Sequence, residues 1–152
     1  ESVSKYLNFD WKVGPHKPNF YKMNDLIGEI EDLVRKLMPT EIFIPHRSYN
    51  QDHCAVHDAC MVALRPHDQN PIVPRVLIYE VDQYQVWTEH PFVPNYFEPI
   101  DIVAKMEAYR LHHSQVRAMR PPELLRSVAH MRGLSCGSDF AEGHQVLRWI
   151  CH

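Results

Sequence analysis

The residues best suited to chemistry lie in one short polar segment. An apolar, β-branched run over residues 42–44 stops at Pro45, and residues 46–53 lead from there into a helix-like pattern that starts near Asp52-His53. This layout predicts an imidazole and a carboxylate at the carboxyl end of a parallel strand, where open α/β sheets bind ligands. The segment is therefore the first place to look for an active or binding site.

Four side chains of this segment are candidate site residues, namely His46, Asn50, Asp52 and His53. A neutral imidazole is a good zinc ligand, and a neighbouring carboxylate can orient it through a hydrogen bond. The alternative is structural, because an acidic residue in the first turn of a helix satisfies free N–H groups and favours the helix dipole. The local sequence leaves both interpretations open.

Two other polar residues, His57 and Arg75, also have both a functional and a structural interpretation. His57 forms an HxxxH pair with His53, but zinc peptidases that use this spacing need a glutamate where this chain has Cys54, so we expect an ordinary surface or half-buried histidine. Arg75 begins a second apolar run and could hold an anionic or hydroxyl-rich substrate through its planar donor fork. Its local sequence favours a solvated charge at a strand end.

Composition limits the classes of protein that fit. The chain has 152 residues, is 45% apolar and 23% charged, and carries a formal charge of −3. This balance is that of one globular domain over residues 1–152, and it argues against nucleic-acid binding. No apolar run is long enough to span a bilayer. The cysteines (Cys54, Cys60, Cys136 and Cys151) form no CxxC pair, which favours reduced thiols in a cytoplasmic protein.

The periodicity predicts alternating helices and strands around the polar segment. A helix runs from an N-cap at Asn24 to a stop at Pro39, and Gly133 and Gly137 break the chain before its last segment. The other expected elements are a strand over 40–44, a helix after 52, a strand over 75–81, an excursion over 86–99 and helices over 102–116 and 121–132. This order predicts an α/β fold with a parallel sheet. No buried strand with a tight turn opens the chain, so we expect an upstream piece.

Several segments together resemble a known family. Asn50-Gln51-Asp52-His53 and the helix ending at Pro66 look like the second motif of the PIG-L/LmbE family of zinc-dependent sugar de-N-acetylases. The resemblance continues in order through residues 74–80, 92–97, Lys105, Ser114-Gln115, Arg132-Gly133 and 140–143. It covers nearly the whole chain. It implies a Rossmann-like three-layer domain with a mainly parallel sheet, incomplete at the amino terminus.

The resemblance also implies a reaction and roles. A catalytic Zn²⁺ would activate water to remove an acetyl group from an N-acetylglucosamine-type sugar or related glycoconjugate. His53 matches one of three metal ligands, Asp52 supports it, and Asn50 is a candidate oxyanion donor. For Arg75, the resemblance favours a contact with the substrate over a solvated charge. The other two ligands and the general base belong to an early HPDD motif, which does not occur in these residues.

Two further departures bear on the expected reaction. Asn50 stands where many members carry histidine, and an amide cannot supply a proton near pH 7, so His46 becomes the candidate proton donor by its proximity. His144 follows Ala-Glu-Gly where the family usually has phenylalanine, and no role is assigned to it. The alternative function is a non-catalytic binding or assembly module of the same fold without metal. The sequence leaves the metal (zinc, iron or manganese) and a homo-oligomer open.

Overall fold

The computed structural model describes residues 17–81 and 91–151, and it divides the chain into two compact units. One unit comprises Pro15–Asn95 and His144–His152, and the other comprises Glu1–Gly14 and Tyr96–Gly143. The expectations for residues 1–16, and for residues 82–90 within the predicted excursion, lie outside the described part. Whether the two units make up the single domain expected for 1–152 stays a prediction, as does the missing amino-terminal piece.

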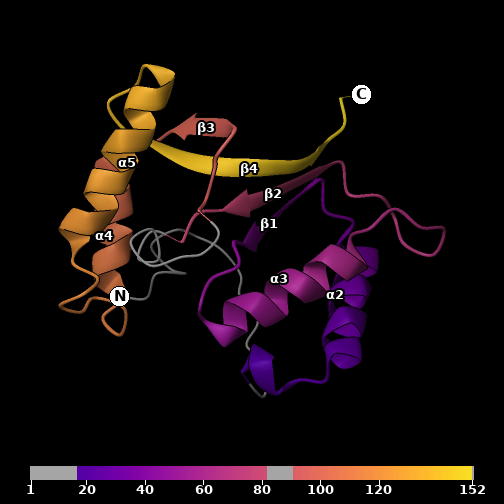
Figure 1. Cartoon of the computed structure of the whole chain (residues 1–152). Helices are drawn as coiled ribbons and strands as arrows, with labels where there is room; N and C mark the ends of the chain where they lie inside the picture. The colour runs from indigo at the N-terminus through magenta and orange to yellow at the C-terminus, as the bar shows by residue number, and fades with distance from the viewer. Residues whose placement is uncertain (1–16, 82–90, 152) are drawn as a thin grey trace. The chain divides into compact units, whose positions relative to one another are not determined.

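The four described strands follow the order β1-β2-β4-β3 (Figure 1). Strand β1 (Glu41–Pro45) pairs in parallel with β2 (Arg75–Tyr79), and β4 (Ala141–Trp149) pairs antiparallel with β2. Strand β3 (Tyr96–Pro99) completes the order. The α/β class is confirmed, but the mainly parallel sheet is wrong. Its prediction failed because apolar runs indicate burial rather than strand direction, and the last segment carries no signal for its reversed direction.

In the first unit, two helices pack over the β1–β2 pair (Figure 1). Helix α3 (Gln51–Ala63) contacts β1, and α2 (Met23–Leu37), which follows the short 3-10 helix η1 (Pro18–Phe20), packs against α3. A second helical layer on the opposite face stays a prediction. The end of α2 fits its sequence signal, since Met38 before Pro39 is left-handed with φ 48°. Its start does not, because the N-cap is Lys22 rather than Asn24, and no side chain caps it.

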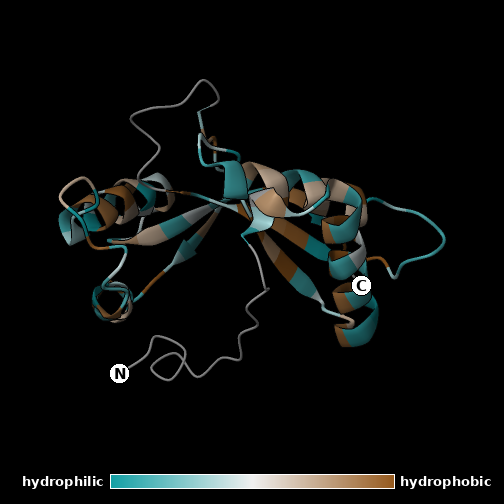
Figure 2. Ribbon diagram, turned by 90° about the horizontal axis from the view of Figure 1, so that it is seen from below, coloured by the Kyte–Doolittle hydropathy of each residue, from teal (hydrophilic) through white to brown (hydrophobic). Residues whose placement is uncertain are grey.

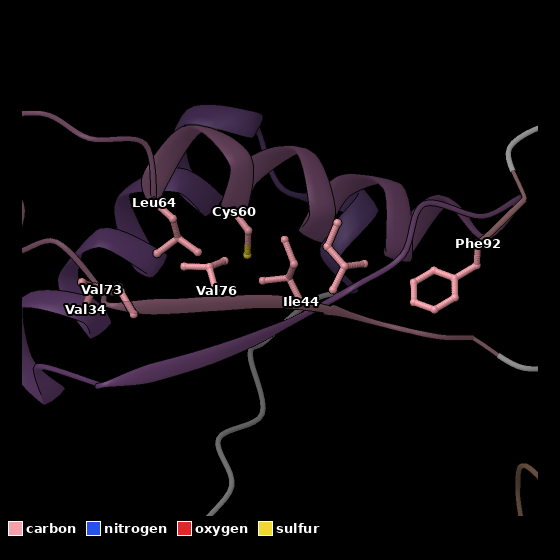
Figure 3. Close-up of a cluster of buried hydrophobic side chains, with 8 residues drawn as sticks. Val34, Ile44, Cys60, Leu64, Val73, Val76 and Phe92 are labelled. Atoms are coloured by element: carbon pink, nitrogen blue, oxygen red, sulfur yellow. The ribbon is translucent and has the colours of Figure 1, made fainter. Parts of the chain in front are cut away.

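The core of this unit fills the space between α3 and the sheet. Figure 3 shows Cys60 and Leu64 facing Ile44 and Val76 from the two strands. Val34 of α2 and Phe92 join the same cluster. Burying an aliphatic side chain of this size contributes roughly 1.5–3 kcal/mol, so this packing fixes α3 on β1. It thereby fixes the turn between them, which carries the predicted site.

The second unit is built on two helices and the segments that flank them. Helix α4 (Ile102–Leu111) starts at Asp101, whose carboxylate accepts from the N–H groups of Val103 and Ala104 at 2.8 and 3.2 Å, and α5 (Pro122–Cys136) ends at Gly137 with φ 77°. Figure 2 shows hydrophobic and hydrophilic stretches alternating along the helices. The predicted break at Gly133 is wrong, because α5 continues through this residue to Cys136.

Candidate functional site

The predicted site segment lies in the first unit, where β1 ends and α3 begins. The parallel register pairs Pro45 with Tyr79, and the backbone N–H of His46 donates to the Tyr79 carbonyl at 3.1 Å. Residues 46–50 therefore leave the sheet at the carboxyl ends of two parallel strands. This is the position expected for ligand binding in such sheets.

Asn50 begins helix α3 as its N-cap. Its Oδ1 accepts a hydrogen bond from the backbone N–H of Asp52 at 2.9 Å, and its own carbonyl accepts from the N–H of Cys54 at 3.1 Å. Asparagine is among the best N-cap residues because its side chain satisfies an N–H left free at the helix start. The cap fixes the orientation of the Asn50 amide and places Asp52 in the first turn.

His53 lies in the first turn of α3 and contacts the preceding loop. The Oγ of Ser48 is 2.9 Å from His53 Nδ1, and the same Oγ accepts a hydrogen bond from the N–H of Asn50 at 3.2 Å. The Ser48 carbonyl accepts from the Cys54 thiol at 2.9 Å. The loop and the helix start are therefore one hydrogen-bonded unit with Ser48 at its centre.

Two further histidines line the same junction. His57 Nδ1 lies 2.9 Å from the carbonyl oxygen of Pro45, which ties α3 to the last residue of β1. The ring of His46 packs edge-on against Phe92, with 5.1 Å between the ring centroids. His57 is half-buried, in agreement with the expectation, but its contact with β1 gives it a defined place at the site.

The structure brings four of the five predicted residues together. His46, Asn50, Asp52 and His53 all belong to the β1–α3 junction. The oxygen at His53 Nδ1 is that of Ser48. The support role of Asp52 stays a prediction.

Arg75 is the predicted residue that the structure does not place in this junction. It pairs with Glu41 in the strand register, at the end of β1 opposite Pro45. Four residue steps along the strand separate the two ends by about 13 Å. Its guanidinium lies 3.4 Å from the Glu41 carboxylate and 5.4 Å from the centre of the Trp149 ring. The substrate contact predicted for Arg75 stays a prediction, and this position does not favour it.

Two residues of the junction received no site role from the sequence: Ser48, which was not singled out, and His57, which was expected to be an ordinary histidine. A serine in a polar loop is too common to signal a role, and its contact with His53 depends on how the loop folds back. His57 had a signal, the HxxxH spacing, but that spacing alone does not reveal a backbone carbonyl in front of the ring.

The donor set at this junction fits part of a metal site. A histidine ligand commonly has an oxygen beside the ring nitrogen that does not bind the metal, and His53 has the Ser48 oxygen beside its Nδ1. Within residues 17–81 and 91–151, however, no three histidine, cysteine or carboxylate side chains are grouped so that they could hold a metal ion. In the same ranges, no helix has the length and apolar character needed to cross a membrane.

Comparison with known proteins gives a limited sequence match. No protein-family profile matches the chain. The chain is 31% identical over 103 residues to a protein of Escherichia coli (strain K12) named uncharacterized deacetylase YaiS; the match covers 61% of this chain and 50% of that relative. The chain thus spans about half the length of the curated relative that it matches.

Two solved structures share the fold. The conserved protein TT1542 from Thermus thermophilus aligns with 99% of this chain and 71% of its own, at a TM-score of 0.76 and 20% identity. The N,N'-diacetylchitobiose deacetylase from Pyrococcus horikoshii aligns with 95% of this chain and 60% of its own, at a TM-score of 0.68 and 15% identity. The structural likenesses show the fold alone.

Proposed function

We propose that this chain forms part of a zinc-dependent N-deacetylase that hydrolyses the acetyl amide of an N-acetylated sugar or related glycoconjugate. The observation that carries the proposal is the β1–α3 junction, where His53 and Asn50 are held together through Ser48. The deacetylase names of the sequence relative and of one fold neighbour support the same reaction class.

In this proposal His53 supplies one metal ligand. When bound, zinc would supply Lewis-acid chemistry and lower the pKa of a water molecule toward about 7. Nδ1 faces Ser48, so the ligating atom of His53 would be Nε2. The described residues do not complete the ligand set, so further ligands would come from other parts of the protein.

Asn50 would act on the substrate rather than on the metal. Its Oδ1 is engaged as the helix cap, so the Nδ2 amide group is the end that can donate to a developing oxyanion. An amide cannot deliver a proton near pH 7, and His46 remains the proposed donor to the leaving amine. Asp52 would contribute negative charge beside these groups in the first turn of α3.

The proposed substrate is a small N-acetyl sugar, in keeping with the diacetylchitobiose named for the Pyrococcus enzyme. The test measures acetate release by the full-length protein from N-acetylglucosamine and its short oligomers. The assay is run with added zinc, with a chelator, and after zinc is restored. Acetate release that the chelator abolishes and zinc restores is expected. A folded, zinc-loaded protein that releases no acetate from these substrates would contradict the proposal, and a folded protein that binds no zinc would favour the binding-module alternative.

A further inference from the structure

Ser48 is the centre of the hydrogen bonds at the β1–α3 junction. Its Oγ lies 2.9 Å from His53 Nδ1 and accepts from the Asn50 N–H at 3.2 Å. Its carbonyl accepts from the Cys54 thiol at 2.9 Å. One small side chain thus contacts two residues of the proposed site directly, and any change in it must act on both.

The contact between Ser48 and His53 can have either of two proton arrangements. A hydroxyl oxygen has two acceptor lone pairs and one proton, and the Asn50 N–H occupies one lone pair. If the Ser48 hydroxyl donates to Nδ1, a neutral His53 carries its own proton on Nε2 and cannot bind a metal there. If Nδ1–H donates to the second lone pair, the lone pair of the ring lies on Nε2.

We propose that Ser48 is a positioning residue that holds neutral His53 with its proton on Nδ1 and its lone pair on Nε2. The inference rests on the proposed function, which requires His53 as a metal ligand through Nε2. Ser48 is half-buried, so its own hydroxyl proton can reach water while the oxygen accepts twice. Histidine ligands commonly donate their other N–H to an oxygen in this way, which fixes the ring orientation.

The neighbouring histidine provides an internal comparison. His57 Nδ1 lies 2.9 Å from the Pro45 carbonyl, and a carbonyl oxygen can only accept. Neutral His57 must therefore carry its proton on Nδ1 and its lone pair on Nε2. The same tautomer at His53 would give both histidines on this side of α3 the same ring chemistry, one through a carbonyl and the other through Ser48.

The first test needs no metal and no activity. Long-range ¹H–¹⁵N spectra of the histidine rings, recorded on the metal-free full-length protein where imidazole is neutral, report which nitrogen carries the proton. We expect the Nδ1–H form at His53 in the wild type and in Ser48→Thr. Ser48→Ala should shift it to the Nε2–H form that free imidazole side chains favour. Ser127→Ala, which removes an exposed hydroxyl from α5, is the matched control and should leave the His53 signals unchanged.

A proton on Nε2 of His53 in the wild type would overturn the inference, and so would an unchanged tautomer in Ser48→Ala. The wild-type spectrum alone can decide against it, even if Ser48→Ala fails to fold. The second readout is zinc affinity of the full-length protein, measured by competition with a chromogenic chelator. It should fall about 10- to 100-fold in Ser48→Ala and recover in Ser48→Thr.

These readouts separate the inference from the proposed function. A protein that releases no acetate but keeps the Nδ1–H form, which is lost in Ser48→Ala, would contradict the deacetylase and support the role of Ser48. An active deacetylase whose His53 carries its proton on Nε2 would support the proposed function and contradict the role of Ser48.

Discussion

The side-chain oxygen of Asn50 lies 2.9 Å from the backbone nitrogen of Asp52 and caps helix α3. This hydrogen bond gives Asn50 a structural role that is independent of any role in catalysis. Both roles use the same amide, but at different atoms, because the cap uses Oδ1 and an oxyanion would be bound by Nδ2. Substitutions can therefore separate them.

Asn50→Asp should keep the cap and lose the amide donor. We expect the free energy of unfolding, measured in urea, to change by only a few tenths of a kcal/mol, because aspartate caps as well as asparagine. Asn50→Ala should lower it by about 1 kcal/mol. If Asn50 also binds the oxyanion, both variants should lose acetate release by about 10²- to 10³-fold in kcat. Activity that follows stability alone would leave Asn50 as a cap only.

Two glycines in helix interiors should respond in opposite directions to the same change. Gly133 of α5 lies against backbone, and a Cβ there would sit 2.5 Å from the Ser138 carbonyl oxygen. At Gly28 of α2, no atom of the described residues other than its chain neighbours and its own helix backbone lies within 4 Å of a Cβ position. Gly28→Ala should raise the free energy of unfolding by about 1 kcal/mol, from helix propensity. Gly133→Ala should lower it by about 1–3 kcal/mol, since backbone must shift. Equal effects in urea denaturation would contradict this contrast.

The thiol of Cys60 should make stability fall in alkaline solution. Burial raises the pKa of Cys60 from 9.0 to about 11. Between these values the folded state holds a proton that the unfolded state has lost, so the free energy of unfolding falls as pH rises through this window. The loss is on the order of 2–3 kcal/mol for a shift of this size. Urea unfolding of the wild type and of Cys60→Ala from pH 8 to 11 isolates the effect. The same slope in both would contradict it.

Arg75 should contribute to stability through its contacts at the amino end of β2. Its ion pair with Glu41 is partly exposed, so its loss should cost less than about 1 kcal/mol. The contact with Trp149 adds a similar amount. Arg75→Ala should therefore lower the free energy of unfolding by about 1 kcal/mol, and Arg75→Lys by less. A raised KM in Arg75→Ala with unchanged stability would instead support the substrate contact predicted from the sequence.

The sequence predicted the elements around the junction better than the contacts within it. The apolar runs ending at Pro45 and near Tyr79, and the polar residues before α3, were enough to place the strands and the helix. The antiparallel direction of β4 could not be predicted, because an alternating or apolar pattern of residues is the same for a strand that runs either way. The expectation at Gly133 failed for a different reason. Glycine usually interrupts helices, but here it permits close approach of the backbone at Ser138.

The site residues divide in the same way. His46, Asn50, Asp52 and His53 are neighbours in the chain, so a local pattern was sufficient to group them. Whether Arg75 lies near them depends on the strand register, which the sequence does not give. The register pairs Arg75 with Glu41, at the other end of β1. The hydrogen bond from the loop back to His53 depends on the folded path of residues 46–50, and no spacing rule gives it.

The most direct test of the proposed function is the metal content and activity of a His53 variant. In the full-length protein, His53→Ala should lower zinc affinity and reduce kcat/KM for acetate release by at least about 10²-fold. Its circular dichroism spectrum should match that of the wild type, which shows that the fold is retained. The control is His113→Ala, which changes an exposed histidine in the second unit and should keep both values. Wild-type zinc binding and acetate release in a folded His53→Ala protein would contradict the central role given to His53.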